Sequence, residues 1–478
     1  MKRIFFAGAI KKIVSAVAPL LLLASCASVD FEQSLATTNK LAEEFTQGQL
    51  SLAQTKAQRD ALATTATEIL QKPVTQAEAV RLALANSPAL QAILAQNWAD
   101  AANAAQTGRI ANPLLTFERM SLGNEVELSQ LLSFGLLDVL TLPQRYRVAQ
   151  RQIAQTQIQL SNSVIEQVTQ VRQAWVKAVA AQQNLSYAKQ VNEAAETSAE
   201  LARRMQAAGN FSRLQRLRQQ AFYADAATQW AGAHHAVTAA REELVRLLGL
   251  TDAQADNLKL PNRLPDLPEQ PRAADEVSKA VKTGRLDIKL AQSSYEGMLK
   301  AQGLSTINSY TDIELGVRNR SVQDSAAGTS ATGSGLEVSV RLPIFDWGGN
   351  RRDAMNAQTL AAAYRLEATV RAAGSSLRES YSAYRTAFDI SKHYRDEIVP
   401  LRKLISEENV LRYNGMFIGV FELLADSREQ ISSVMGAIAA SQQFWLADAA
   451  LQASLIGKPT MSSIDSMASS SMSSGGGH

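Results

Sequence analysis

The sequence predicts a mainly α-helical fold with a small β part, in which one order of elements occurs twice. Long helices would pack side by side in a coiled-coil array. Four strands per chain would belong to a transmembrane β-barrel that further copies of the chain complete. Three observations predict this fold: a stretch of 65 residues without Pro or Gly, four strand-length runs of alternating polarity, and turn signals that recur at a nearly constant offset.

Residues 1–25 have the layout of a secretory signal peptide, with basic residues near the start, an apolar stretch at 13–23 and small residues before Cys26. Cys26 is the only cysteine, and a cysteine directly after Leu-Ala-Ser resembles a bacterial lipobox. That resemblance implies that the thiol is lipidated and that Cys26 is the mature N-terminus. Ala27 in place of Asp implies the outer membrane as destination. The alternative is a buried or leftover thiol.

Composition argues against several classes of function. Removing the four basic residues of 1–26 leaves 44 Lys and Arg against 45 Asp and Glu, so the mature chain has no basic excess for nucleic acid. A single cysteine allows no intrachain disulfide and no cysteine-based zinc site. The four histidines have no i, i+4 spacing, and the sequence contains no dinucleotide-binding, P-loop, zinc-protease or serine-hydrolase motif. We therefore expect no metal site, no cofactor and no enzymatic activity.

The first structural repeat is predicted over 75–249, after a lipid-anchored N-terminal segment at 26–74. Its long central run, 144–208, contains neither Pro nor Gly, and Gly209-Asn210 ends it. At 1.5 Å per residue that run would span about 100 Å, a length that helices keep only when they pack side by side. The predicted elements, in order, are a helix at 75–110, strands at 113–121 and 125–134, and helices at 144–208 and 214–248.

A second repeat is predicted over 274–457. The Pro-rich linker 250–273 precedes it and a low-complexity tail, 458–478, follows it. Leu342-Pro343 lies 200 residues after Leu142-Pro143, and Gly415 lies 206 residues after Gly209. This nearly constant offset indicates duplication. The predicted elements are a helix at 274–304, strands at 309–320 and 335–344, a helical run at 350–413 and a helix at 420–455.

Three of the predicted strands have one apolar and one polar face. In 335–344, Val338 and Val340 alternate with Glu337 and Ser339, and 309–320 and 125–134 alternate similarly apart from Gln130. A half-buried soluble sheet would show the same pattern, but strand length and the expected anchor favour a transmembrane barrel with lipid outside. Because four strands cannot close a barrel and open edges are not tolerated in lipid, the chain must form an oligomer.

The order of these elements, together with short motifs in both repeats, resembles the TolC-like outer-membrane efflux proteins, in their lipid-anchored branch. The resemblance covers about residues 70–457. It rests on Asn86-Ser87-Pro88, on Leu342 to Asp346 with Gly348-Gly349, and on paired motifs that begin at Arg204 and Arg412. It implies a homotrimer whose single β-barrel is continuous with a tunnel, a barrel of coiled-coil helices that crosses the periplasm.

The resemblance also implies that the turns at Gly209 and Gly415 form the far end of the tunnel. There a periplasmic adaptor protein would dock and link the tunnel to an inner-membrane pump. Glycine would supply the positive φ that a tight turn between helices needs. Arg204 and Arg412 would contact the partner, or they could only offset the helix dipole. The expected adaptor-contact residues are Arg204, Gly209, Ser212, Arg412, Tyr413 and Gly415.

A closed duct needs a constriction, which some members of this family form with aspartates six and nine residues after the second tip glycine. Here Phe421 and Leu424 occupy those positions, and the nearby acids are Glu422 and Asp426. Either the shifted acids form the constriction or its seal is apolar, so all four residues are gate candidates. A surface role for both acids is equally open.

The expected function is a passive channel-tunnel that exports small molecules or ions, the outer component of a tripartite efflux or type I secretion system. The alternative is a trimeric coiled-coil structural or adhesin-like lipoprotein, for which sustained heptads without paired tip turns would be typical. The substrate stays open among metal ions, organic compounds and protein. Membrane lipid, the adaptor and the pump are the expected partners, and nucleic acid is not.

Overall fold

The computed structural model describes residues 30–274, 285–310, 313–342 and 344–457, with the backbone alone at 304–310. The signal peptide, Cys26 and the tail 458–478 therefore lie outside the described residues. The chain forms two compact units. One takes the residues up to 34 with 96–159 and 289–369, and the other takes 35–95, 160–288 and the residues from 370 onward. Each unit draws on both predicted repeats.

The segment before residue 75, predicted only as an anchored stretch, contains helices α2 (Phe31–Leu41), α3 (Glu43–Thr46) and α4 (Lys56–Ile69). A reciprocal capping box begins α4: the Thr55 side chain accepts from the Gln58 N–H, and the Gln58 side chain accepts from the Thr55 N–H. The Asn39 side chain fastens the connection between α3 and α4 by bonding both the N–H and the carbonyl of Leu50, each at 3.1 Å. Caps and side-chain contacts thus order this short-helix segment.

The helix predicted at 75–110 is two helices, α5 (Gln76–Asn86) and α6 (Pro88–Thr107). Ser87 between them is extended, with φ −75° and ψ 114°, because a proline disfavours helical backbone at the residue before it. Pro88 then begins α6, where a backbone N–H would have no intrahelical partner. Asn86 Nδ2 donates to the carbonyl oxygens of Leu248 and Gly249, at 3.3 and 2.8 Å, and so fixes the break against the end of α9.

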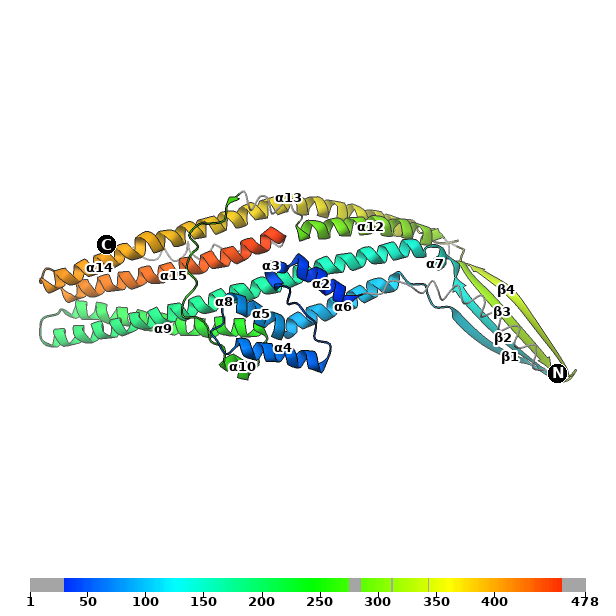
Figure 1. Ribbon diagram of the computed structural model, residues 1–478, viewed down its shortest axis with the longest axis horizontal. Helices are drawn as coiled ribbons and strands as arrows, with labels where there is room; N and C mark the ends of the chain where they lie inside the picture. Colours follow the sequence, from blue (N-terminus) through cyan, green and yellow to red (C-terminus); the bar gives the residue numbers. More distant parts are fainter. Residues whose placement is uncertain (1–29, 275–284, 311–312, 343, 458–478) are drawn as a thin grey trace. The chain divides into compact units, whose positions relative to one another are not determined.

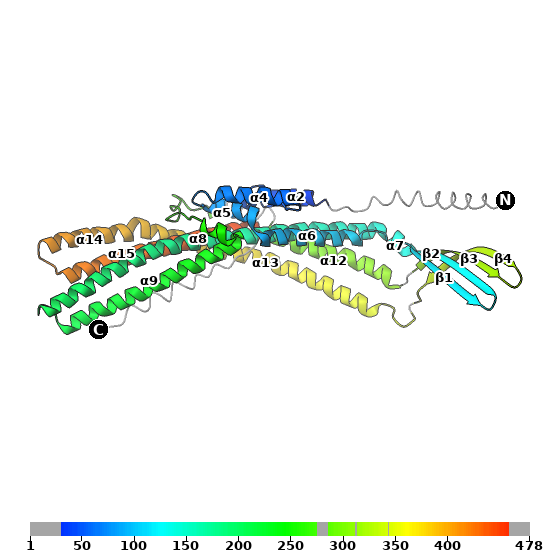
Figure 2. The same cartoon turned by 90° about the horizontal axis from the view of Figure 1, so that it is seen from below.

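The two long helices of the first repeat are confirmed. α8 (Leu142–Ala207) has 66 residues and α9 (Arg213–Leu248) has 36, and a short helix, α7 (Leu136–Leu140), precedes them. α8 begins two residues earlier than predicted, because Pro143 fits the first turn of a helix. The two helices lie side by side near their connecting turn (Figures 1 and 2), where Ser198 Oγ donates to Gln219 Oε1 at 2.9 Å.

The second repeat differs from its prediction at several boundaries. After the linker, which contains α10 (Asp252–Asp256), the described part of the first helix is α12 (Leu286–Tyr310), so residues 309 and 310 are helical and not the start of a strand. The strands are β3 (Ile313–Asp324) and β4 (Thr329–Val340). The prediction missed the first part of β4, since Thr329 to Ser334 lack apolar alternation, and hairpin pairing with β3 makes them a strand.

The helical run predicted at 350–413 contains a π-helical turn. It consists of α13 (Gly349–His393), the π-helix η2 (Tyr394–Ile398) and α14 (Val399–Asn414), and α15 (Val420–Ile456) follows. Pro400 explains the turn, because a proline ring clashes with the carbonyl four residues earlier, here that of Asp396, unless the helix widens locally. Among the helices within the described ranges, none is long and apolar enough to cross a bilayer.

The four strands form one antiparallel sheet in the order β1 (Leu114–Leu122), β2 (Glu125–Gly135), β3 and β4. Two hairpins, one from each predicted repeat, meet where β2 pairs with β3. In this register Leu115, Leu132, Val317 and Leu336 lie opposite one another across the whole sheet. The sheet therefore joins both repeats, and β1 and β4 are its edges.

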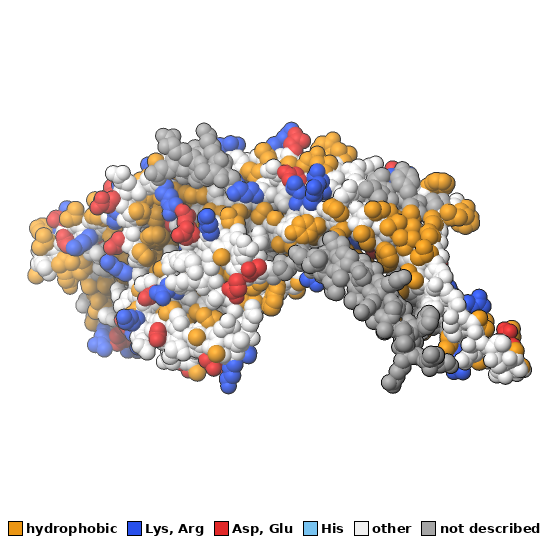
Figure 3. All heavy atoms as spheres, turned by 45° about the vertical axis from the view of Figure 1, so that its right-hand side comes forward, with side chains coloured by type: hydrophobic (Ala, Val, Ile, Leu, Met, Phe, Trp, Pro, Cys, Tyr) orange, Lys and Arg blue, Asp and Glu red, His pale blue; other side chains and the backbone are white. Residues whose placement is uncertain are grey.

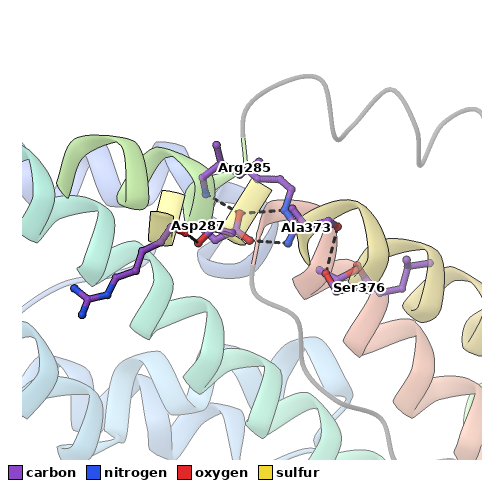
Figure 4. Close-up of polar contacts among 9 residues, drawn as sticks. Arg285, Asp287, Ala373 and Ser376 are labelled. Atoms are coloured by element: carbon purple, nitrogen blue, oxygen red, sulfur yellow. Dashed lines mark hydrogen bonds and ion pairs between the residues drawn. The ribbon is translucent and has the colours of Figure 1, made fainter. Parts of the chain in front are cut away.

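Buried contacts hold the unit that contains 160–288. Trp175 is 2% exposed, and its indole N–H donates to the Val74 carbonyl at 2.8 Å. The Arg285 side chain is fully buried, yet its guanidinium pairs with Asp287 at 2.7 Å and donates to the Ala373 carbonyl at 3.0 Å (Figure 4). A buried charge is tolerated only with such partners, so Arg285 ties the start of α12 to the middle of α13.

Candidate functional site

One candidate site is the apolar face of the sheet, where large side chains are exposed on all four strands. On β4, Leu336, Val338 and Val340 are 87, 60 and 48% exposed, and on β3 Val317 is 51% exposed. β1 and β2 continue the face with Leu115, Phe117, Leu128, Leu132 and Phe134. The alternation predicted for three of the strands is confirmed in β2, in β3 and in the last part of β4, and the exception Gln130 lies on this face opposite Phe117 and Asn319. An exposed apolar surface on every strand marks an interaction face.

The opposite face of the sheet is charged. Arg318 pairs with Glu337 across β3 and β4 at 2.6 Å, and Arg320 pairs with Glu127 across β2 and β3 at 2.5 Å. Leu131 also points to this side and is accommodated by Gly316, where an added Cβ would lie 2.7 Å from Leu131 Cδ1. Glu337 is therefore on the polar face as predicted. β2, β3 and β4 each separate an apolar side from a polar one, whereas on β1 Leu114, Met120 and Leu122 lie on the polar side and Arg119 lies on the apolar side.

The first tip turn joins α8 to α9 as expected. Gly209 is left-handed with φ +79°, and the Asn210 N–H bonds the Met205 carbonyl at 2.9 Å, which is the Schellman pattern of a helix end. Ser212 is the N-cap of α9: its hydroxyl accepts from the Gln215 N–H at 3.2 Å, and Gln215 accepts from the Ser212 N–H at 2.9 Å. Gly209 and Ser212 thus shape this turn from both sides.

The second tip turn corrects the prediction for Gly415. Gly415 has φ −79°, and Met416 takes the left-handed position with φ +61°. The Phe417 N–H bonds the Arg412 carbonyl at 2.9 Å, so the hydrogen-bond pattern is that of the first turn. A Cβ added at 415 would lie 2.8 Å from the Phe417 ring, so any larger residue there must displace that exposed ring. The prediction of a positive φ at Gly415 is therefore wrong, and Met416 is the residue that the sequence argument missed.

Matching the two turns by structure changes their offset. Gly209 corresponds to Met416, and the N-cap Ser212 corresponds to the N-cap Gly419, so equivalent positions are 207 residues apart and not 206. Gly419 has no side chain and makes no cap hydrogen bond. The first turn is thus polar at its helix start, whereas the second exposes Met416 and Phe417 at 93 and 83%.

The tip arginines lie in exposed ion pairs on their own helices. Arg204 Nε lies 2.8 Å from Glu200, and Arg412 Nε lies 3.3 Å from Glu408, each four residues earlier. Hydrogen bonds from Arg203 and Arg204 lower the pKa of the Glu200 carboxyl. Tyr413 beside them is 39% exposed. Because a guanidinium has five N–H donors, each arginine keeps donors for a further acceptor.

The gate candidates divide into two environments. Phe421 stacks on Phe211 of the first tip turn, with ring centroids 4.4 Å apart, so an aromatic pair joins the two helical hairpins. Leu424 lines a cavity of about 20 Å³ together with Phe222 and Arg428, whose guanidinium lies 3.2 Å from the Phe222 ring centroid. Phe211 and Phe222 could not be predicted from the sequence, since nothing in their local pattern marks a partner some 200 residues away.

The two acids of the gate set differ in exposure. Glu422 is exposed in the first turn of α15, where a carboxylate suits the helix dipole. Asp426 is half-buried, and its Oδ2 has no hydrogen-bond partner among the described residues. The structure therefore brings Phe421 and Leu424 toward the other hairpin and leaves Glu422 outside that contact. In the described part of the chain, no group of three or more His, Cys, Asp or Glu is placed to hold a metal ion.

Comparison with known proteins gives matches among solved structures only. No family model matches the chain, and no curated protein sequence matches it. The Campylobacter jejuni CmeC outer membrane channel superposes with a TM-score of 0.66 at 13% identity, over 85% of this chain and 89% of that one. The outer-membrane channel OprN gives 0.64 at 17% identity, over 91% of this chain and 96% of that one.

A third similar structure is the open state of the Neisseria gonorrhoeae MtrE outer membrane channel. It superposes with a TM-score of 0.62 at 18% identity, over 80% of this chain and 89% of that one. Sequence identity this low means that the fold is what the chain shares with these channels. The expected TolC-like fold, mainly helical with a small β part, is thereby confirmed.

Proposed function

From the fold that it shares with outer-membrane channels, we propose that the chain is a passive outer-membrane duct that acts as a homotrimer. The duct would be the outer component of a tripartite efflux or type I secretion system and would export small molecules or ions. The observation that carries the proposal is the four-stranded sheet, which exposes one apolar face and ends in two edges.

The sheet is incomplete as a membrane-spanning structure. β1 and β4 each lack a neighbour on one side in the described sheet. In lipid, each unpaired backbone N–H or C=O group costs several kcal/mol, on the order of a hydrogen bond that is not made. Because neighbouring strands alternate in direction, β4 of one copy runs antiparallel to β1 of the next. Edge-to-edge pairing of three copies then closes one barrel of twelve strands.

Such a closed barrel would place the two faces of the sheet in different solvents. The face with Leu336 and Val338 would meet lipid, and the face with the Arg318–Glu337 and Arg320–Glu127 pairs would line a water-filled lumen. This assignment explains why large apolar side chains are exposed on one face of β2, β3 and β4. A soluble sheet would need another layer over that face.

The two tip turns would serve as contacts for a periplasmic adaptor, which connects the duct to an inner-membrane pump. Arg204 and Arg412 are 76 and 57% exposed at the side chain and keep donors for a partner's carbonyls or carboxylates. Tyr413 and the shaping residues Gly209, Ser212 and Gly415 complete this proposed contact set. Paired turns of this kind are not needed by a structural stalk, which is the alternative function.

The lipid anchor is part of the proposal. Acyl chains on Cys26 would hold the N-terminal segment at the outer membrane, in keeping with the single cysteine after Leu-Ala-Ser. Cys26→Ser should abolish labelling by a radioactive fatty acid. An intact mass that fits an unmodified Cys26 in the wild-type protein would rule out the anchor, while the duct itself could still insert through its strands.

Single-channel recording in planar lipid bilayers tests the duct. Purified trimer should give discrete conductance steps that are lost after dissociation into monomers, since one chain supplies four strands only. A stable trimer that binds membranes and conducts no ions would support the structural-stalk alternative and contradict the proposal.

A further inference from the structure

A cavity of about 290 Å³ lies where the linker crosses the long helices, within one compact unit of the chain. Figure 1 shows the linker, in dark green, running across α8 and α15. The Leu264 N–H donates to Gln183 Oε1 on α8 at 3.4 Å, and the Trp445 indole N–H on α15 donates to the Pro265 carbonyl at 3.1 Å. The proposed duct and its tip contacts assign no role to this cavity.

The inner walls of the cavity are apolar and come from the linker, α14 and α15. Leu264 of the linker and Ile438 of α15 are 5 and 4% exposed, and Val399 and Val434 also line the cavity. Pockets for small molecules typically measure about 300–1,000 Å³ and are lined mainly by such side chains. The cavity is at the lower end of that range, so it has room for a small apolar body of one or two rings.

A buried hydroxyl in the wall of the cavity has no partner within the chain. Ser391 of α13 lines the cavity and is 6% exposed, yet its hydroxyl makes no hydrogen bond to any of the described residues. Buried polar groups in proteins nearly always have a hydrogen-bond partner, because leaving one unsatisfied costs stability. The Ser391 hydroxyl is therefore available to a molecule that occupies the cavity.

A guanidinium lies on the same helical face as this hydroxyl. Arg395 follows Ser391 by four residues, the spacing of side chains that are neighbours on a helix, and it also lines the cavity. Its Nε and Nη2 donate to Asp396, which is outside the lining, at 2.6 and 3.1 Å, and Nη1 has no partner in the described structure. Arg263 and Asp266 of the linker pair at 3.5 Å, so the charged side chains that line the cavity leave an excess of one positive charge.

We propose that this cavity binds a small organic anion, whose carboxylate or sulfonate accepts hydrogen bonds from Ser391 Oγ and Arg395 Nη1. Charge-assisted hydrogen bonds of this kind are the strong ones, and a guanidinium suits an anionic oxygen. The apolar body of the anion would lie against Leu264 and Ile438, which remove it from water. Because lining residues come from α8 as well as from α13, α14 and α15, the anion would bridge the two predicted repeats. This inference does not depend on the proposed duct.

Isothermal titration calorimetry of the full-length protein in nanodiscs tests the site with two probes. Naphthalene-2-sulfonate carries the charge, and naphthalene-2-sulfonamide is a neutral molecule of nearly the same shape. This comparison is needed because hydrophobic side chains are exposed elsewhere, for example at the end of the helices away from the sheet (Figure 3), where rings alone could bind. We expect saturable binding of the sulfonate at one site per chain, about tenfold tighter than that of the sulfonamide.

Three variants locate the binding. Arg395→Gln should weaken binding of the sulfonate about tenfold and leave that of the sulfonamide unchanged. Arg402→Gln removes an arginine of α14 that pairs with Glu429 outside the cavity, and it should alter neither. Ala437→Phe places a ring in the cavity and should abolish binding of both probes. Equal affinity for the two probes, equal loss in the two arginine variants, or no saturable binding, which would leave the cavity to water, would each overturn the proposal.

Discussion

At the scale of single residues, the two tip glycines have different physical roles although the sequence presents them alike. Gly209 is required by its φ of +79° and has open space around its Cα. Gly415 has an ordinary φ, and the ring of Phe417 occupies the place that a Cβ would take. One position thus depends on backbone conformation and the other on packing.

A rescue experiment distinguishes these roles. Gly209→Ala should destabilise the protein by about 1–2 kcal/mol, the cost of a left-handed conformation for an L-residue. Gly415→Ala should cost less, about 0.5 kcal/mol, because the Cβ displaces only the exposed Phe417 ring, and Phe417→Ala should restore that loss. Thermal unfolding of detergent-solubilised protein measures each effect, with Gly232→Ala, at an open position inside α9, as the control. A double variant at 415 and 417 no more stable than Gly415→Ala would refute the packing explanation.

Asp448 on α15 links protonation to stability. It is 8% exposed, Arg272 lies 3.6 Å away, and Gln452 Nε2 donates to it at 2.6 Å. Burial raises the pKa of this carboxyl above its ordinary 3.8, and Arg272 opposes the rise. The unfolded chain therefore ionises at a lower pH than the folded one. The contribution of Asp448 to the free energy of unfolding is therefore greatest below pH 3.8, and it falls as the pH increases toward the raised pKa of the folded protein.

Asp448→Asn removes that ionisation. The thermal midpoint of the variant minus that of wild type should therefore increase as the pH rises from 3.8 and then level off. Asp389→Asn, which changes a carboxylate on α13 that is 53% exposed at the side chain, serves as the control and should show no such trend. A difference for Asp448→Asn that shrinks with rising pH would show that the ion pair with Arg272 outweighs burial.

Local sequence could predict some residues of the site and could not predict others. Gly209 was predictable because glycine at a helix end favours positive φ. Met416 was not, since methionine seldom adopts a left-handed conformation, and the neighbouring Gly415 gave a stronger signal for the wrong position. The Phe211–Phe421 stack joins residues 210 positions apart, and only the packing of the hairpins brings them together.

At the scale of elements, alternation predicted the strands wherever both faces carry distinct side chains. β3 and the last part of β4 alternate clearly, whereas Thr329 to Ser334 consist of small and polar residues that gave no signal. Their position follows from the hairpin, in which Asp324 lies opposite Thr329 and Ile313 lies opposite Val340. The π-helical turn before Pro400 was also missed, because helical periodicity does not reveal a local widening.

Arginine substitutions on β4 test which face meets lipid. Val338→Arg should reduce the yield of trimer, because a charge on the lipid face costs roughly 2–4 kcal/mol near the bilayer midplane. Val340→Arg should impair trimer yield less, since Val340 is the last residue of the strand. Ser339→Arg, one residue away on the other face, should be tolerated and should alter conductance. Equal tolerance at 338 and 339 would indicate a soluble sheet.

At the scale of the whole molecule, the duplicated order of elements does not correspond to two separately packed halves. Each compact unit contains residues of both predicted repeats. The reason is visible in the sheet, where the hairpin of the first repeat pairs with that of the second along β2 and β3. Turn signals and strand alternation predicted the order of elements, but which elements pack together depends on contacts between distant residues.

A contact between the two repeats also involves one of the gate candidates. Phe421 stacks on Phe211, so the α14–α15 turn is held to the α8–α9 turn by an aromatic pair. If the resting duct is sealed by apolar contact, this pair would keep the two hairpins together in the closed state. If acids form the constriction, Glu422 is the better placed, since it is exposed, while Asp426 is half-buried.

Single-channel recordings of three variants separate these mechanisms. With an apolar seal that works through the stack, Phe421→Ala and Phe211→Ala should raise resting conductance to a similar extent, because either removes the pair. With a ring made by Phe421 itself, Phe421→Ala alone should raise it. With an acidic ring, Glu422→Gln/Asp426→Asn should weaken cation selectivity, since three copies of each carboxylate around one axis attract cations. If none of the three variants changes conductance or selectivity, the constriction lies elsewhere in the duct.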